Sequence, residues 1–418
     1  MAHTMAHTRS RAGTGVLTTA VVLLALSGCG GSAVSDAQDD GKGPLKIGVI
    51  VPLTGPVSST GKALRNGFEL GVKKVNAAGG VGGERVQYVV VDDAGDPATS
   101  TQLARRLIQQ DRVSMLFGTI TGDTAEAVAK VAGDAKVPFG TAILGDVERC
   151  HPYGWGFGES TRQLLTPTMP KLIEKYGTKV AIVGSDYNYP RFYAGVVKEL
   201  VKREGGSVVA EEYSPIGQTD WQPVIKRLKA AKPQVLMSMV VGADAVAFSQ
   251  QAKQFGLLTP ELGYEGAPLD SDYHPALSAL VNGRTHTVRW ADGLDDPESR
   301  TFVADYRAAY KFNAPLPEVA GNAYFGIQFF LAAAKKAGGG AGGSGSGANA
   351  NSADGKAINT EISRLTFDSP LGKGTRFDPA NHVFQADMLE AVIKPGREYE
   401  VGRKLGRILD TTPKPGCS

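Results

Sequence analysis

The sequence has few of the residues from which catalytic and metal centres are built. Its 418 residues include three cysteines and six histidines. Apart from His3 and His7 in the repeated Met-Ala-His-Thr at the start, to which we assign no metal role, no two histidines have the spacing of a helical zinc pair. His-Glu-x-x-His, a Gly-x-Ser-x-Gly elbow and a helix-opening Gly-x-Gly-x-x-Gly turn are all absent. Nothing in the sequence therefore supports catalysis, and we expect a protein that is not an enzyme and uses no cofactor or metal.

The sequence also lacks a large excess of charge of either sign. The chain has 45 basic and 42 acidic residues and a formal net charge of +3. No basic stripe interleaved with aromatic residues is present, which argues against a nucleic-acid surface. After the N-terminal segment no apolar run reaches the ~20 residues of a transmembrane helix. The length of the chain suggests two or three domain-sized units.

Residues 1–28 have the features of an export signal. Arg9 and Arg11 form a basic start, and residues 16–26 are apolar but too short to span a bilayer as a mature helix. The following Leu-Ser-Gly-Cys resembles a bacterial lipobox, which predicts a lipid on Cys29; an ordinary secretory peptide with an incidental cysteine is the alternative. Residues 29–44 are small and polar and suit a flexible tether. We expect the lipid to hold the protein at the outer face of the bacterial cytoplasmic membrane.

Two further cysteines remain, Cys150 and Cys417. Outside the cytoplasm two leftover thiols tend to pair, so a disulfide that ties down the C-terminus is one expectation. The alternative expectation is that Cys150 and Cys417 stay separate thiols, because their spacing in the sequence does not show whether they are close in space.

Residues 46–97 predict a βαβ unit. KIGVIV is an apolar, β-branched run that predicts a strand, and RVQYVVV predicts a second one. Between them, apolar residues recur at helical spacing until Gly79 and Gly80 end the pattern. Ligands of open α/β sheets lie beyond the carboxyl ends of the strands, so the loop 52–61 faces a candidate site. A simple connector is the alternative interpretation of that loop.

The alternation of strand and helix patterns continues along most of the chain. A second series starts with KVAIVGSD at residue 179 and includes predicted helices at 190–204, 220–230 and 243–254. We therefore predict an α/β protein with two doubly wound lobes and a cleft between them. Residues 338–356 are rich in glycine and serine and predict a disordered loop. A phosphate-binding loop is excluded there, since no strand precedes the tract and no Gly-Lys-Ser/Thr occurs.

Four ordered pieces of the first unit resemble the leucine/isoleucine/valine-binding family of ABC-transporter solute receptors. They are the opening strand, Pro-Leu-Thr-Gly at 52–55, a helix that ends in Asn-Ala-Ala-Gly-Gly at 76–80, and a strand that ends in Asp-Asp at 92–93. The resemblance covers roughly residues 45–400. It implies type I periplasmic-binding-protein lobes joined by a three-strand hinge. On that basis lobe 1 is predicted at 45–158 and 289–367, and lobe 2 at 159–288 and 368–410.

Tyr187 and Tyr189 are candidate ligand residues. They follow the predicted strand KVAIVG in the sequence Ser-Asp-Tyr-Asn-Tyr-Pro-Arg, and Pro190 fits the first position of the next helix. Aromatic side chains there can cover an apolar ligand body, or they can simply pack on the lobe. The turn resembles that of the amide- and urea-binding subgroup, in which both tyrosines line the pocket.

Lobe 1 offers hydroxyl groups and a helix start. Thr121 and Thr124 can donate hydroxyls, the helix predicted at 124–135 offers backbone N–H groups, and Asp123 is either an N-cap or a ligand contact. Relatives carry a hydroxyl residue at the place of Gly122. Thr141 and Ile143 belong to the second pocket strand; amide and urea binders tend to have an aromatic at Thr141, which argues against a urea-sized pocket.

Glu265, in Gly-Tyr-Glu-Gly, aligns with the acid that neutralises the ligand ammonium in leucine-type receptors. A desolvated ammonium needs such a paired charge, whereas a solvated loop glutamate is the alternative interpretation. The resemblance implies a monomeric receptor that hands a small polar solute to an ABC permease. We expect an amino acid, branched-chain-like, and next a short amide or urea. A receptor that senses its ligand without transporting it is the rival class.

Overall fold

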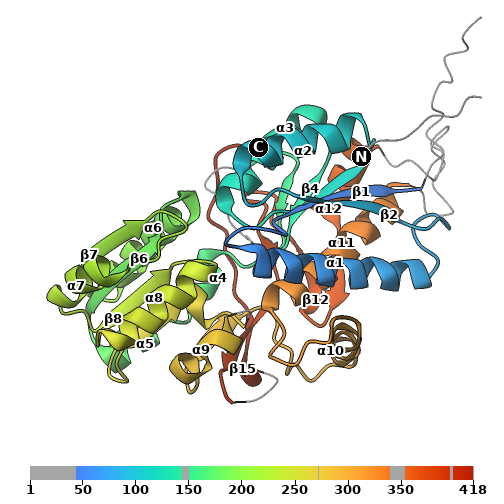
Figure 1. Cartoon of the computed structure of the whole chain (residues 1–418). Coiled ribbons are helices and arrows are strands. Elements are labelled where there is room, and N and C mark those ends of the chain that lie inside the picture. The colour runs from blue at the N-terminus through green and yellow to red at the C-terminus, as the bar shows by residue number, and fades with distance from the viewer. Residues whose placement is uncertain (1–43, 144–149, 272, 339–353, 396–398, 418) are drawn as a thin grey trace, which may run out of the picture. The chain divides into compact units, whose positions relative to one another are not determined.

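The structure is a computed structural model that describes residues 44–143, 150–271, 273–338, 354–395 and 399–417 (Figure 1). The predicted signal peptide, Cys29 and the predicted tether up to residue 43 lie outside these residues, as does most of the glycine-rich tract. Among the described helices, none combines the length and the apolar character that crossing a membrane requires.

The first lobe is built on a parallel sheet with the strand order β2-β1-β3-β4-β5. β1 pairs with β2 on one side and with β3 on the other, as expected for right-handed βαβ crossovers. The carboxyl ends of these strands therefore share one edge of the sheet. The strands are β1 (Lys46–Val51), β2 (Gln87–Asp92), β3 (Met115–Gly118), β4 (Phe139–Thr141) and β5 (Gly154–Gly156).

Helices from distant parts of the chain accompany this sheet. α1 buries the predicted stripe that includes Leu64 and Phe68, and it packs along α11. A Cβ on Gly67 would lie 2.0 Å from the carbonyl oxygen of Ala320, so the two helices approach closely because residue 67 has no side chain. The helices are α1 (Ser58–Ala77), α2 (Pro97–Gln109), α3 (Gly122–Ala135), α10 (Pro297–Tyr310), α11 (Glu318–Ala337) and α12 (Gly355–Arg364).

The second lobe repeats the plan with a parallel sheet of order β7-β6-β8-β9, drawn in green and yellow in Figure 1. The predicted architecture of two doubly wound lobes is confirmed. Its strands are β6 (Lys179–Ser185), β7 (Ser207–Ser214), β8 (Val235–Met239) and β9 (Gly263–Gly266). Its helices are α4 (Thr161–Leu165), α5 (Met169–Tyr176), α6 (Asn188–Arg203), α7 (Gln222–Ala230), α8 (Ala243–Gln254) and α9 (His274–Val281), with a 3₁₀ turn at Ala267–Leu269.

The C-terminal segment forms two small antiparallel sheets. β10 (Thr285–Val288) pairs with β14 (Asp387–Val392), which pairs with β15 (Glu400–Arg407). β11 (Phe367–Ser369), β12 (Gly372–Phe377) and β13 (Phe384–Gln385) form the other. Phe377 packs against Trp155 and Phe329 of the first lobe, with ring centroids 5.1 and 5.3 Å apart. β12 and β13 thus pack with lobe 1, whereas the sequence analysis assigned residues 368–410 to lobe 2.

Two local predictions also differ from the structure. Pro190 is the third residue of α6, not the first, because the helix already begins at Asn188. The predicted loop 338–356 is too long at its end, because α12 begins at Gly355 and Asp354 caps it by accepting the N–H of Lys356.

Cys150 and Cys417 are joined by a disulfide, with their Cα atoms 5.0 Å apart. The backbone N–H of Cys150 also donates to the carbonyl oxygen of Pro415 at 3.0 Å. The last described residues are therefore held to the segment that leads into β5.

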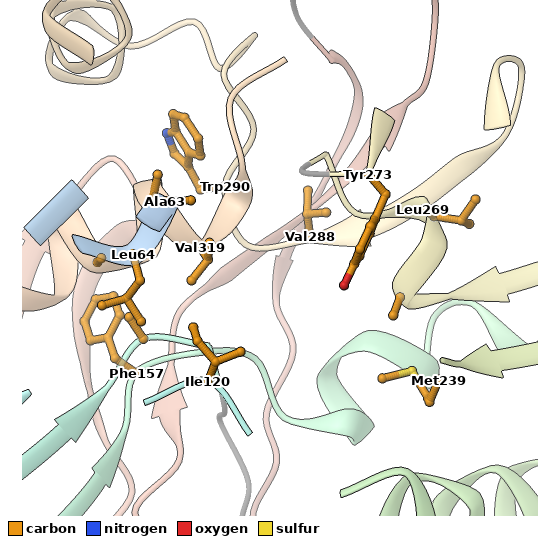
Figure 2. Packing of buried hydrophobic residues seen from close by; sticks show 14 of the residues in the cluster. Ala63, Leu64, Ile120, Phe157, Met239, Leu269, Tyr273, Val288, Trp290 and Val319 are labelled. Carbon is orange, nitrogen blue, oxygen red and sulfur yellow. The ribbon is translucent and has the colours of Figure 1, made fainter. Parts of the chain in front are cut away.

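A large apolar core cluster includes residues from both lobes and from the segments that connect them. Figure 2 shows part of it: Leu64, Phe157 and Trp290 lie on one side of the view, and Met239 and Leu269 on the other. Ile120 and Val319, between these groups, are at the edge of the cavity described next.

Candidate functional site

One cavity is lined by residues at the carboxyl ends of strands in both sheets. Ile120 follows β3 and Ile143 follows β4, while Met239 ends β8 and Gly266 ends β9. Its position agrees with the general rule for ligand sites in open α/β sheets.

Five of the eight predicted ligand residues line this cavity: Thr121, Ile143, Tyr187, Tyr189 and Glu265. The other three, Asp123, Thr124 and Thr141, do not. The Thr124 hydroxyl is used within its own helix, where it donates to the carbonyl oxygen of Thr121 at 2.9 Å. Thr141 is buried and lines a separate, smaller cavity beside Cys150 and Trp155.

Asp123 is not the N-cap of α3, which was one of its two predicted roles. Thr121 is the N-cap of α3, and Asp123 is the second helical residue. Burial raises the pKa of the Asp123 carboxyl, and a hydrogen bond from the backbone N–H of Asn188 opposes that shift. A Cβ on the neighbouring Gly122 would lie 2.2 Å from the Asn188 side-chain oxygen. The absence of a side chain at residue 122 thus makes room for α6.

Three tyrosines face the cavity from the start of α6. Tyr187 is the N-cap residue, and Tyr189 and Tyr193 follow within the first two turns. The Tyr189 hydroxyl lies 3.3 Å from that of Thr161. The Tyr193 hydroxyl is buried and has no hydrogen-bond partner among the described residues. Burial raises the pKa of Tyr187, so its phenol is neutral and can donate a hydrogen bond.

Glu265 is a buried residue of β9, with 3 % of its surface exposed, and it is bonded to a histidine that the sequence analysis did not single out. This residue is His286, on β10. Its Nδ1 lies 2.7 Å from Oε1 of Glu265, and its Nε2 lies 3.0 Å from Oδ1 of Asp270. Burial opposes a charge on His286, but the two carboxylates outweigh it and raise its pKa well above the usual value. His286 is therefore an imidazolium that donates from both ring nitrogens.

A second carboxyl pair lines the cavity at the start of α11. Burial, together with the nearby Glu159 carboxylate, raises the pKa of Glu318 well above its usual value, and the two side chains share a hydrogen bond. Asn322, one turn along α11, donates its amide N–H to Glu159 at 3.0 Å. Arg289 is the neighbouring cation, with its Nε 3.8 Å from Glu159.

The site is thus rich in carboxyl groups. Four buried or half-buried carboxyl groups, Glu159, Glu265, Asp270 and Glu318, are accompanied by His286 and Arg289. Ligand atoms of Asp270, His286 and Glu318 all lie within 4.8 Å of one another, a spacing that a cation can bridge. Such an arrangement favours a ligand that brings positive charge. Sequence patterns did not identify His286, Glu318 or Asn322, because the role of each depends on a contact with a residue that is distant in the sequence.

Comparison with known proteins gives the family. Residues 44–397 match the family model described as periplasmic binding protein, and the chain belongs to this family. The family consists of extracytoplasmic solute-binding proteins that have no catalytic role and that work with the membrane permeases of ABC transporters.

Individual relatives agree with this assignment. Leu/Ile/Val-binding protein homolog 7 of Brucella suis is 26 % identical over 370 residues, which cover 82 % of this chain and 88 % of that protein. A solute-binding protein from Rhodopseudomonas palustris BisB5, solved with 3,4-dihydroxybenzoic acid, is 25 % identical with a TM-score of 0.74 and covers 90 % of this chain and 99 % of its own. The leucine-binding protein LivK of Thermotoga maritima shares the fold at 19 % identity, with a TM-score of 0.72 over 85 % of this chain and 98 % of its own.

Proposed function

We propose that this protein captures an amino acid in the cavity and delivers it to an ABC permease. The observation that carries the proposal is the charge of the cavity, in which four carboxyl groups stand against one imidazolium and one guanidinium. A desolvated carboxylate needs a paired positive charge, and the α-ammonium group of an amino acid supplies one. Glu265 and Asp270, which hold His286 between them, are the proposed partners of that ammonium.

The start of α3 suits the solute's carboxylate, which is attached to the same carbon as the ammonium. Thr121 is the N-cap residue of α3 and lines the cavity, and the first turn of a helix offers backbone N–H groups that have no partner within the helix. Apolar side chains elsewhere in the lining, including Ile120, Ile143 and Val241, suit the aliphatic body of a side chain. This division of polar and apolar groups supports the branched-chain-like class expected from the sequence.

Two other solute classes are weaker candidates. Aromatic acids such as the one bound to the Rhodopseudomonas relative would match the tyrosines, but they bring a carboxylate and no cation. A short amide or urea would match Tyr187 and Tyr189, but it is neutral and leaves the excess of carboxyl groups unpaired. The charge balance therefore favours an amino acid over both.

The remaining parts of the proposal concern the whole receptor. A lipid on Cys29 would hold a monomer at the outer face of the cytoplasmic membrane, with residues 29–44 as its tether. Lobe 1 (45–158 and 289–367) and lobe 2 (159–288 and 368–410, apart from β12 and β13) would close on the solute about a hinge. A ligand that contacts both lobes would select the closed state.

A thermal-shift screen of protein lacking residues 1–29 tests the solute class. The panel holds aliphatic and basic amino acids, benzoates, short amides and urea. Each compound is used at a concentration about a hundred times the dissociation constant expected for a bound solute. A bound solute should stabilise the protein by about 2.7 kcal/mol at that excess. We expect amino acids alone to raise the melting temperature. A shift with benzoates or amides and none with amino acids would overturn the proposal.

A gene for a permease beside this gene would support transport, and a gene for a kinase there would support the sensing alternative. Glu265→Gln tests the proposed partner of the ammonium. It should lower the affinity for the amino acid, and circular dichroism checks that the variant used for the measurement is folded.

A further inference from the structure

The amide of Asn322 has only one possible orientation. Its Nδ2 lies 3.0 and 3.3 Å from the two carboxylate oxygens of Glu159. A carboxylate accepts hydrogen bonds, so the nitrogen of the amide must face it and the oxygen must face elsewhere. Asn322 is 1 % exposed and lines the solute cavity, and its Oδ1 has no donor among the described residues. A buried acceptor without a donor is costly, and proteins retain few of them.

The neighbouring cation does not supply the missing donor. Arg289 directs Nη1 to the carbonyl oxygen of Phe157, and it directs Nη2 to Gln163 at 2.9 Å and to the carbonyl oxygen of Phe384 at 3.2 Å. Its Nε lies nearest to Glu159. The guanidinium is thus committed to the connecting segments and leaves the oxygen of Asn322 unpaired.

Three acceptor groups therefore line one part of the cavity, which we call the α11 corner: the oxygen of Asn322 and the carboxyl groups of Glu159 and Glu318. One oxygen of Glu318 already accepts the backbone N–H of Arg289 at 2.6 Å, which leaves its other oxygen for a ligand. Glu159 and Glu318 share a hydrogen bond with each other, which keeps one proton between them in the absence of a cation. A primary ammonium has three N–H donors and one positive charge. It matches both the number of acceptors and the charge of the α11 corner.

We propose that the solute is a diamino acid, whose second ammonium group binds in the α11 corner while its α-ammonium binds beside Glu265 and Asp270. This inference rests on the proposed capture of an amino acid and specifies its side chain. The two subsites adjoin, because ligand atoms of Asp270 and Glu318 lie within 4.8 Å of each other. A short aliphatic chain with a terminal amino group spans them. The apolar lining between β3, β4 and α11 contacts its methylene groups.

Ornithine and norleucine provide the test, because their side chains have the same number of heavy atoms and differ in the terminal amino group. Their binding to the exported protein in detergent is measured by isothermal titration calorimetry. A site built around donors discriminates strongly against a ligand that lacks them, so we expect ornithine to bind at least ~10-fold more tightly than norleucine. Citrulline, which ends in neutral N–H groups, separates the charge from the donors and should bind more weakly than ornithine.

Asn322→Leu removes the amide and keeps the number and branching of the side-chain heavy atoms. It should lower the affinity for ornithine by about tenfold and leave that for norleucine within about twofold. Gln328→Leu is the matched control, because Gln328 is a buried amide on the same helix outside the cavity lining. It should change neither affinity.

Each outcome decides the proposal. Norleucine binding as tightly as ornithine overturns the inference and leaves amino-acid capture in place. If citrulline binds as tightly as ornithine, the proposal that a second ammonium group binds in the α11 corner is wrong. If neither ornithine nor any other amino acid binds, the proposed function falls and the inference falls with it. If Asn322→Leu fails to fold, the comparison of the three ligands on the unchanged protein still decides.

Discussion

His286 and Glu265 form a buried ion pair, in which Nδ1 of the imidazole lies 2.7 Å from Oε1 of the carboxylate. The residue that the sequence suggested as a ligand contact is thus also the partner of a protein cation. Glu265 also lines the cavity, so a solute ammonium there would join an existing pair. The electrostatics of solute binding and of folding are therefore linked at this position.

The pair predicts that stability depends on pH in a defined direction. Because the folded protein raises the pKa of His286, the stabilisation is complete below about pH 6.5, the usual imidazole value, and is lost as the pH rises through the folded-state pKa. Burial raises the pKa values of Asp270 and Glu318, which gives the same sign. His286→Gln should therefore be about 3 kcal/mol less stable than the unchanged protein at pH 5.5, with a smaller gap at pH 9.

Urea denaturation at the two pH values measures this gap. His274→Gln is the control, because the ring of His274 hydrogen-bonds the amide of Asn282 and no carboxylate. A gap for His286→Gln that is equal at pH 5.5 and pH 9 would contradict the prediction.

Gly242→Ala should weaken solute binding by disturbing a contact between the lobes. Gly242 precedes α8 at a φ of 65°, a Cβ there would lie 2.5 Å from the carbonyl oxygen of Pro56, and Ala243 N donates to that oxygen at 3.1 Å. We expect a loss of about 1–3 kcal/mol in binding free energy. Gly205→Ala is the matched control, since Gly205 has a φ of 74° and no atom within 4 Å of its Cβ. Equal effects of the two substitutions on affinity would show that backbone strain alone is responsible.

Reduction of the Cys150–Cys417 disulfide should destabilise the folded protein. A cross-link that closes a long loop restricts the unfolded chain, and its removal commonly costs about 2–5 kcal/mol. Urea denaturation of the Cys150→Ala/Cys417→Ala variant measures the loss. Solute affinity should stay within about twofold, because neither cysteine lines the solute cavity. A large loss of solute affinity with an unchanged unfolding free energy would contradict the prediction that the disulfide stabilises the fold without affecting solute binding.

Arg289→Met should be strongly destabilising. Its guanidinium is fully buried and donates to groups on three segments, at Phe157, Gln163 and Phe384. Removing it takes the donor from those acceptors and the neighbouring cation from the Glu159 carboxylate, and we expect a loss of about 3–5 kcal/mol in unfolding free energy. Arg300→Met removes an exposed pair with Asp295 and should cost less than about 1 kcal/mol. Similar losses of unfolding free energy for both variants would contradict the prediction that the buried contacts of Arg289 stabilise the fold.

Local patterns predicted the elements well, because helix and strand periodicity depends on near neighbours. The helix predicted at 243–254 is observed at those residues, and the one predicted at 190–204 begins two residues earlier. Long-range pairs were not predictable in this way. Asn322 and Glu159 are 163 residues apart, and neither stands in a motif that signals the other. The placement of β12 and β13 likewise depends on aromatic packing of Phe377 with residues far back in the chain.

The disulfide has a consequence for the covalent connectivity of the protein. Residues 150–417 form a closed ring that contains the whole second lobe and returns to the first. A protease that cuts one peptide bond anywhere within this ring leaves both fragments in a single covalent molecule. Under non-reducing conditions such a nicked receptor would migrate as one species, still carrying everything N-terminal to the ring, including the residue predicted to bear the lipid.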